Sequence, residues 1–330
     1  IKGVYITYKW MFRVASTPES GGGHMMRCLS IGRELHKYQS VHFLLCKGGE
    51  YWIDRIKHYG MTASVYKLPE EIKNKNLLVD GYYFSNLEVK VWRKQCKYMA
   101  FIDDADTAPK SKYADMIIYT HLNSIHNNKN QIKLQGNKYA LLSPEYANFF
   151  FNHSLKEVRN ILISCGLLDS NNYTGQVLES LSKTDFDGNV NIAIGDYAPC
   201  LHKLLNSINN YNFSVNIILN SNGLYDLLLQ SNMVIGTGGV SLLERMALGK
   251  PSVTIIAAEN QRSQAKWAEN AGATILVDPA KQKFKHDINS AIDFLLKSEE
   301  KRLEMSGKGI SIIDGKGSDR VARCMAFGEC

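Results

Sequence analysis

A histidine follows three consecutive glycines near the start of the chain. The stretch Ser16–Cys28 reads STPESGGGHMMRC, and apolar residues at helical spacing begin at its end. A histidine in the first turn of a helix lies at the positive end of the helix dipole, which disfavours imidazolium and leaves a neutral ring able to accept a proton. His24 is therefore a candidate general base, with Gly21, Gly22 and Gly23 leaving room for a ligand. The alternative is a histidine that merely occupies an early helical position.

A second glycine-rich turn lies far along the chain, between a predicted strand at 233–235 and a predicted helix that stops near Gly249 and Pro251. Glycines let the backbone approach an anion closely, and the first N–H groups of a helix have no internal partner. A phosphate is the natural ligand, although such glycines can also serve only to pack a helix on a strand. With the turn at Gly236, Gly238 and Gly239, the candidate ligand contacts are Gly238, Gly239, Val240, Ser241, Glu244, Glu259, Asn260 and Gln261.

Polar side chains follow other predicted strands. Asp80 and Tyr82 come at the end of an apolar run, and Asn123 follows another. Ligands of open α/β sheets collect at the carboxyl ends of the strands, so Asp80 and Tyr82 are expected beside His24. An equal alternative is that Asp80 caps the next helix. The acidic group Asp103, Asp104 and Asp106 lacks the spacing of a calcium loop and is interpreted as solvated acids, so no metal site is predicted.

These residues need two α/β domains to position them. Strand and helix patterns alternate through 1–150 and begin again in 151–330, as a parallel sheet with right-handed crossovers requires. The aromatic segment 139–153 suits a crossing between the domains. A last helix is predicted at 318–327, and whether it packs back on the first domain is left open. The predicted strands are 9–15, 41–46, 63–67, 77–80, 98–102, 116–119, 159–164, 190–194, 216–219, 233–235, 252–257 and 274–277. The predicted helices include 24–38, 51–58, 88–96, 174–181, 200–208, 224–229, 262–271 and 288–303, the last as one helix or two.

Composition narrows the class of protein. The 330 residues are 45% hydrophobic with a formal charge of +7, and Lys and Arg are scattered without a basic block. A phosphorylated small molecule therefore fits the charge, and no nucleic-acid partner is expected. The sequence has no apolar run of about 20 residues and no signal-peptide pattern, which predicts a cytoplasmic protein without membrane insertion. Seven cysteines, an odd number without CxxC spacing, predict free thiols. The oligomeric state is left open.

Two motifs, one in each half, carry a family resemblance. They are R-x-A-S-x-x-x-x-G-x-G-H-x-x-R-C at 13–28 and G-x-G-G-x-S-x-x-E-R-x-x-L-G-x-P…E-N-Q at 236–261. With V-D-G-Y at 79–82, D-D at 103–104, L-N at 122–123 and Y-A-L-L at 139–142, the chain resembles the pseudaminic-acid pathway hydrolases over nearly its whole length. Those enzymes hydrolyse UDP-2,4-diacetamido-2,4,6-trideoxy-β-L-altropyranose.

The resemblance implies a GT-B-like fold, with two Rossmann-like parallel-sheet domains facing a central cleft. It also implies a metal-independent enzyme without a cofactor. Such an enzyme uses water in place of a sugar acceptor and inverts the configuration at the anomeric carbon. Its base matches His24, and its nucleotide-side residues match Gly238, Gly239 and Glu244. The UDP-sugar is the expected partner. Arg27 belongs to the same motif and is expected to contact substrate.

The chain departs from the family pattern at Ala15, where the family has Asp, at Ser143, where it has Arg, and at Leu167, where it has Gly. These departures bear on the sugar and on activity. Two alternatives follow. One is a GT-B glycosyltransferase related to the MurG type, for which Trp10, Met11 and Phe12 could form a membrane-docking patch, although core positions in a strand suit them better. The other is a non-catalytic nucleotide-sugar-binding protein.

Overall fold

The chain folds into two compact units. Unit 1 comprises Ile1–Ala147 together with Gly315–Cys330, and unit 2 comprises Asn148–Asp314. The structure is a computed structural model that describes residues 9–20, 22–103, 111–119, 131–148 and 156–330. Each unit is an α/β domain with its own parallel sheet and its own apolar core.

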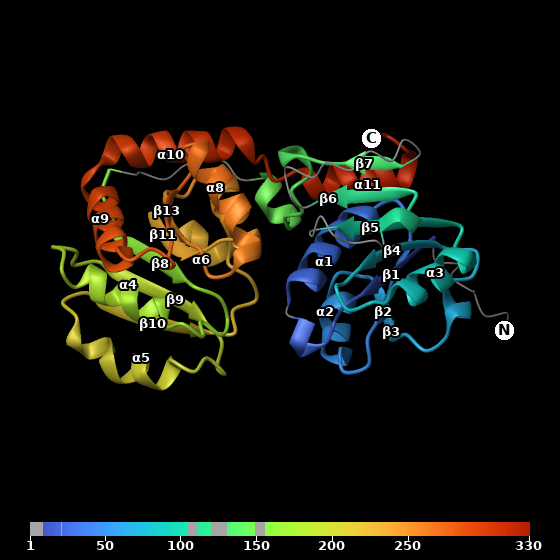
Figure 1. Cartoon of the computed structure of the whole chain (residues 1–330), viewed down its shortest axis with the longest axis horizontal. Helices are drawn as coiled ribbons and strands as arrows, with labels where there is room; N and C mark the ends of the chain where they lie inside the picture. Colours follow the sequence, from blue (N-terminus) through green and yellow to red (C-terminus); the bar gives the residue numbers. More distant parts are fainter. Residues whose placement is uncertain (1–8, 21, 104–110, 120–130, 149–155) are drawn as a thin grey trace. The chain divides into compact units, whose positions relative to one another are not determined.

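In the described part of unit 1, the sheet has seven parallel strands in the order β3-β2-β1-β4-β5-β6-β7 (Figure 1). The central strand β1 is buried at every residue of Trp10–Val14, as expected for a parallel strand covered on both faces. Neighbouring β1 and β4 end together, with Val14 beside Asp80 in the register. The strands are β1 (Trp10–Val14), β2 (Val41–Leu45), β3 (Thr62–Val65), β4 (Asn76–Asp80), β5 (Tyr98–Asp103), β6 (Met116–Tyr119) and β7 (Ile132–Leu134).

Helices cover both faces of this sheet. On one face, Trp10, Phe12 and Val14 join a core with residues of α1 (Gly23–Leu35), α2 (Ile53–His58) and α11 (Gly317–Phe327). On the other face, Met11 packs with residues of α3 (Asn86–Gln95). Figure 1 shows α1 and α3 on opposite sides of the strands. Trp10, Met11 and Phe12 are therefore core residues, and the membrane-docking interpretation is wrong for them.

Unit 2 repeats the arrangement with six parallel strands among its described residues, in the order β10-β9-β8-β11-β12-β13. Because β11 lies between β8 and β12 in the middle of the sheet, the glycine turn that follows it leaves from the centre of the carboxyl edge. The strands are β8 (Asn160–Ser164), β9 (Asn189–Ile194), β10 (Ser214–Leu219), β11 (Met233–Thr237), β12 (Ser252–Ile255) and β13 (Ile275–Val277).

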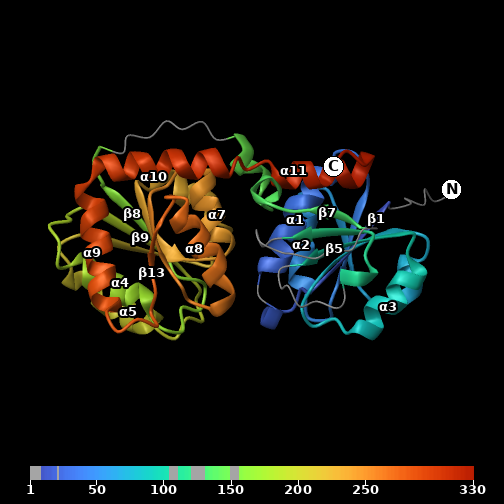
Figure 2. The same ribbon diagram turned by 45° about the horizontal axis from the view of Figure 1, so that its top comes forward.

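Two groups of helices flank this second sheet. Figure 2 shows α4, α5 and α9 on one side and α7 and α8 on the other. The first group shares the main core of unit 2, to which Val177, Leu204 and Ile292 belong. The helices of unit 2 are α4 (Tyr173–Leu181), α5 (Leu201–Ser207), α6 (Tyr225–Gln230), α7 (Val240–Ala247), α8 (Arg262–Asn270), α9 (Phe284–Lys297) and α10 (Glu299–Ile312).

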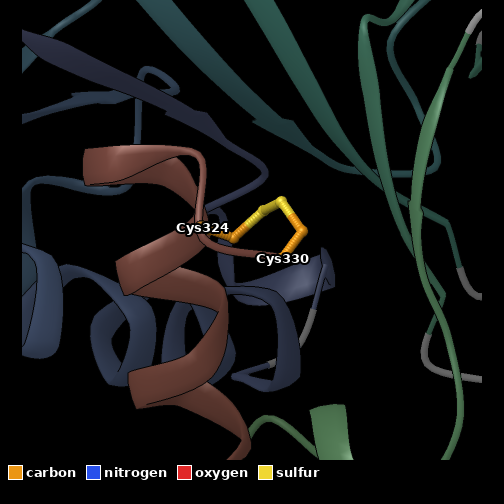
Figure 3. Close-up of a disulfide and its surroundings, with 2 residues drawn as sticks. All are labelled: Cys324 and Cys330. Atoms are coloured by element: carbon orange, nitrogen blue, oxygen red, sulfur yellow. A yellow bond between two sulfur atoms is a disulfide. The ribbon is translucent and has the colours of Figure 1, made fainter.

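The last helix, α11, belongs to unit 1 although it follows unit 2 in the chain. It packs against α1, and Val321, Ala322 and Met325 enter the unit 1 core. At its end, Cys324 and Cys330 form a disulfide (Figure 3). The prediction that the cysteines are free thiols is therefore wrong for these two, because an odd cysteine count does not exclude a single short-range pair.

Other differences from the sequence expectations are local. Gly236, predicted in the turn, is a residue of β11, and the strand runs on to Thr237. Strand β7 was not predicted. Asp103, predicted to be solvated, is buried at the end of β5, while Asp104 and Asp106 lie outside the described residues. None of the helices in the described ranges combines the length and apolar content of a membrane span.

Candidate active site

Helix α1 begins immediately after the loop that follows β1. Gly22 occupies its N-cap position without a side-chain cap, and His24 is its second residue. Apolar Met25, Cys28 and Ile31 bury one face of the helix on the sheet. The His24 ring is 4% exposed. The predicted position in the first turn is confirmed, but the ring lies much deeper than a loop position would allow.

A fully buried carboxylate lies beside this histidine. Asp80, the last residue of β4, is 0% exposed. Its Oδ1 lies 2.7 Å from His24 Nδ1 and 2.5 Å from Arg27 Nη2. Its Oδ2 accepts from Arg27 Nε at 2.6 Å and from the Cys28 thiol at 3.4 Å. All four contacts come from one turn of α1, so the end of β4 and the start of α1 are fixed to each other.

These contacts assign the tautomer of His24. An ionised carboxylate only accepts hydrogen bonds, so the 2.7 Å contact requires the hydrogen on Nδ1. Arg27 Nη2 lies 2.9 Å from the same Nδ1, and the two nitrogens both donate to Asp80 Oδ1. The lone pair of the neutral ring is then on Nε2. The arrangement supplies a histidine whose second nitrogen can take up a proton while the carboxylate stabilises the imidazolium that forms.

Asp80 stays ionised in spite of its burial. Burial alone raises the pKa of a carboxyl, but the charge and hydrogen bonds of Arg27 and the hydrogen bond of His24 outweigh it and lower the pKa of Asp80. Burial and the neighbouring Asp80 raise the pKa of the Cys28 thiol well above its usual value, so that thiol stays protonated. The group therefore contains one carboxylate and one guanidinium at neutral pH.

The loop after β4 adds an aromatic side chain. The rings of Tyr82 and His24 meet edge to face, with centroids 4.6 Å apart, and Tyr82 is 47% exposed. Gly81 precedes it, and a Cβ there would lie 2.8 Å from both Ala15 Cβ and Phe84 Cε2. Ala15 is thus packed where a larger side chain would crowd this loop. Asp80 and Tyr82 lie beside His24, as the strand-end argument predicts.

Asp80 does not cap the following helix. Ser85 is the N-cap of α3, and its hydroxyl accepts from Glu88 N at 3.2 Å while Glu88 Oε2 accepts from Ser85 N at 2.7 Å. The capping interpretation of Asp80 is therefore wrong. Of the predicted ligand contacts in unit 1, Gly22 and Gly23 lie at the start of α1, Arg27 is bonded to Asp80, and Gly21 and Asn123 lie outside the described residues.

In unit 2, the turn between β11 and α7 needs its glycines. Gly239 has φ +83° and ψ −154°, a conformation that is essentially restricted to glycine. A Cβ on Gly238 would lie 3.0 Å from Gln261 Cβ. The Ser241 hydroxyl donates to the Thr237 carbonyl oxygen at 3.3 Å, which closes the turn. The start of α7 is built as a compact backbone surface of the kind that accepts an anion.

Some of the other predicted contacts lie next to this turn and others lie further from it. Gln261 lies against Gly238 and Gly239, and its Oε1 accepts from the Ala257 backbone at 3.3 Å. Glu259 and Asn260 are exposed in the same short 3-10 turn, and Glu259 pairs with Arg262 at 2.9 Å. Val240 is 40% exposed at the first position of α7. Glu244 lies one helical turn further along.

Sequence reasoning missed the ion pair that organises unit 1. Arg27 is expected from the sequence to contact substrate, yet the residue is 7% exposed and its guanidinium holds Asp80. His24 and Arg27 are three residues apart and share a helix face, which is a signal for a common partner. Of the other departures, Ser143 bonds to Arg33 at 2.9 Å, and Leu167 is exposed after β8.

Residues 160–316 match the model of the glycosyltransferase family 28 C-terminal domain. This match covers nearly all of unit 2 and none of the histidine site. Among curated proteins, an uncharacterized protein of Methanocaldococcus jannaschii is 27% identical over 74% of this chain and 54% of its own length. The spore coat polysaccharide biosynthesis protein SpsG of Bacillus subtilis is 24% identical over 64% of each chain. The chain thus spans between half and two thirds of the length of these relatives.

Solved structures with the same fold match nearly the full length of this chain. MurG of Acinetobacter baumannii superposes with a TM-score of 0.68 at 12% identity, covering 95% of this chain and 97% of its own. A co-structure of MnaA of S. aureus with UDP gives a TM-score of 0.68 at 12% identity, covering 98% and 97%. The chain therefore has a GT-B fold, as predicted, with two Rossmann-like parallel-sheet domains.

Proposed function

We propose that the chain is a nucleotide-sugar hydrolase that releases UDP from a UDP-sugar. The observation that carries the proposal is the contact of 2.7 Å between His24 Nδ1 and a buried, ionised Asp80. This contact fixes a ring whose Nε2 can act as a general base. The family resemblance supports UDP-2,4-diacetamido-2,4,6-trideoxy-β-L-altropyranose as the substrate, in the biosynthesis of pseudaminic acid or a related nonulosonic acid.

The proposed reaction is an inverting displacement by water. His24 Nε2 takes a proton from water while the water oxygen forms a bond to the anomeric carbon. The bond between that carbon and the diphosphate oxygen breaks, and UDP leaves with the electron pair. Asp80 stabilises the imidazolium that forms, and Arg27 keeps Asp80 ionised and in place.

We assign the diphosphate to the turn at Gly238 and Gly239. Backbone N–H groups at the start of α7 and the helix dipole favour the negative charge that grows on the leaving group. Glu244, one turn along α7, is the proposed ribose contact, and Gln261 beside the glycines is a proposed diphosphate or ribose contact. The UDP co-structure of the similarly folded MnaA supports a UDP ligand for this fold.

The test is turnover of UDP-sugars without an acceptor. Purified protein is incubated with the diacetamido sugar nucleotide and with UDP-N-acetylglucosamine, and UDP release is followed. We expect release without acceptor, and we expect His24→Asn to lower kcat by roughly two orders of magnitude or more while the UDP dissociation constant stays nearly unchanged. His286→Asn is the matched control, because that side chain is 77% exposed on α9, and it should turn over normally.

Equal turnover in His24→Asn and the wild type would remove His24 from the mechanism. Weaker UDP binding together with lost turnover would instead indicate a folding defect or a binding role.

Glycosyl transfer is the second candidate, favoured by the match of residues 160–316 to a glycosyltransferase domain. The same assay separates the two reactions. Release of UDP only after an acceptor is added supports transfer, and in that case His24 deprotonates an acceptor hydroxyl rather than water.

A further inference from the structure

Helix α7 carries a buried arginine that the proposed reaction does not use. Arg245 is 1% exposed in the second turn of the helix. Its side chain runs back toward the start of α7, as helical side chains do. Nη2 donates to the Thr237 carbonyl oxygen and to the Thr254 hydroxyl, both at 3.0 Å. Because Thr237 directly precedes Gly238, the guanidinium is fixed one peptide away from the glycine turn.

This guanidinium is incompletely paired. Its Nε and Nη1 are buried and have no hydrogen-bond partner in the described part of the chain. The strand leaves space for it, because a Cβ on Gly236 would lie 2.7 Å from Nη1. The sequence pattern places Gly236 in the turn itself, whereas in the structure it belongs to β11 and makes room for the Arg245 guanidinium.

Arg245 remains charged at neutral pH. Burial lowers its pKa to about 10, which still leaves the group protonated at pH 7. Burial also raises the pKa of the neighbouring Cys165 thiol, so that thiol is neutral and supplies no counter-charge. Glu244 is the carboxylate that acts on Arg245, from the adjacent position of α7.

The position of this charge is unfavourable in the absence of an anion. Cations stabilise the C-terminal end of a helix, whereas this one lies at the N-terminal end, where the dipole is already positive. Buried N–H donors without partners add a further cost. An anion bound at the turn offsets the cost of the uncompensated positive charge, and an uncharged ligand does not.

We propose that Arg245 is a positioning residue that makes the turn at Gly238 and Gly239 select ligands by the number of phosphate charges they carry. It holds the Thr237 carbonyl, and with it the turn, and it adds a fixed positive charge behind the backbone N–H groups. The inference rests on the proposed function, which puts the diphosphate of the UDP-sugar at this turn. Affinity then decreases from UDP to UMP to uridine, and the differences in affinity between these ligands depend on Arg245.

The test compares the three ligands by calorimetry in the wild type, Arg245→Met and Arg245→Lys. In Arg245→Met the ratio of UDP to uridine affinity should fall by about tenfold or more, since the fixed positive charge behind the turn is lost. Arg245→Lys keeps the charge and should retain most of the ratio. Arg302→Met is the matched control, because Arg302 is also a buried arginine of unit 2, bonded to the carbonyl oxygens of Leu295 and Lys156, and it should leave the ratio unchanged.

The outcomes are separable. A wild type that binds none of the three ligands defeats the proposed function. A wild type that binds UDP, with an unchanged ratio in folded Arg245→Met, defeats only the role of Arg245. If Arg245→Met does not fold, Arg245→Lys and inorganic pyrophosphate decide: displacement of UDP by pyrophosphate and a retained ratio in Arg245→Lys support the inference. Failure of pyrophosphate to displace UDP from the wild type overturns it.

Discussion

At the scale of single residues, unit 1 depends on one carboxylate that water does not reach. Moving an isolated carboxylate into a protein interior costs several kcal/mol, so Asp80 is tolerated only because His24, Arg27 and Cys28 all donate to it. Because Asp80 accepts a hydrogen bond from His24 Nδ1, it also determines that Nε2 is the basic nitrogen of His24. The sequence was enough to expect the histidine and the aspartate at the same edge of the sheet. Their direct hydrogen bond and the ion pair with Arg27 could not be foreseen, because residues 56 positions apart meet only through the sheet register.

Replacing this carboxylate tests both of its effects. Asp80→Asn removes the negative charge that pairs with the Arg27 guanidinium, and it allows the His24 ring to adopt the tautomer with its hydrogen on Nε2. We expect kcat to fall by roughly two to four orders of magnitude and the free energy of unfolding to fall by about 3 kcal/mol at pH 7. UDP affinity should stay within about twofold, because the turn to which we assign the diphosphate is in unit 2. Turnover assays, urea unfolding and calorimetry measure the three quantities.

The pH dependence of Asp80→Asn separates charge from packing. The pKa of Asp80 is lower in the folded protein than in the unfolded chain, so its contribution to stability is present above the unfolded value of about 3.9. That contribution is lost as pH falls through the folded pKa. The stability difference between the wild type and Asp80→Asn should therefore shrink in acid, and a difference that stays constant from pH 7 to pH 3 would contradict a charged Asp80.

At the scale of elements, buried parallel strands were predictable and helix packing was not. Strands such as β2 and β6 are short apolar runs between polar segments, and their predicted positions agree with the structure within one residue. The helix after 288 was predicted to end near 303, yet α10 continues through Gly307 and Gly309 to Ile312. Local propensity stops a helix at such glycines, but contact with α7 outweighs it. Strand β7 has only three residues and carries too short a pattern to detect.

The two glycines of α10 provide a matched pair. A Cβ on Gly309 would lie 2.8 Å from the Met246 carbonyl oxygen of α7, whereas a Cβ on Gly307 would meet nothing within 4 Å. Gly309→Ala should destabilise unit 2 by about 1–3 kcal/mol, because backbone blocks the new methyl group. Gly307→Ala should be neutral or stabilising by about 0.5–1 kcal/mol. Urea unfolding of both variants checks this, and equal effects would mean that α10 does not pack so closely on α7.

At the scale of the whole molecule, the two units differ in how the chain builds them. Unit 2 is one continuous segment, whereas unit 1 is completed by the last sixteen residues, Gly315–Cys330. A Cβ on Gly317 would lie 2.1 Å from the Ala140 carbonyl oxygen, so α11 begins in direct contact with the unit 1 backbone. A division of the sequence into two consecutive domains misses this exchange, because an amphipathic terminal helix does not reveal which core it joins.

Removing Gly315–Cys330 should therefore destabilise α1, which lies near the other end of the sequence. In a chain ending at Asp314, we expect amide-exchange protection to fall in α1, which loses Val321, Ala322 and Met325 from its core, and to persist in α4. Cys330→Ser is the control, because it removes the disulfide but keeps the helix. It should cost about 2 kcal/mol, the loop-closure value for so short a ring, without exposing α1. Equal loss of protection in α1 and α4 would contradict separate cores.

The discontinuity of unit 1 also bears on the order of events during synthesis. A ribosome makes the histidine, the carboxylate and their strands before unit 2, but it makes the helix that closes their core only after unit 2. All residues of unit 2 are therefore available before unit 1 is complete, and the earlier segments of unit 1 must wait with an uncovered apolar face until Gly315–Cys330 has been made. We expect this waiting period, rather than intrinsic stability, to make the protein depend on chaperones in the cell.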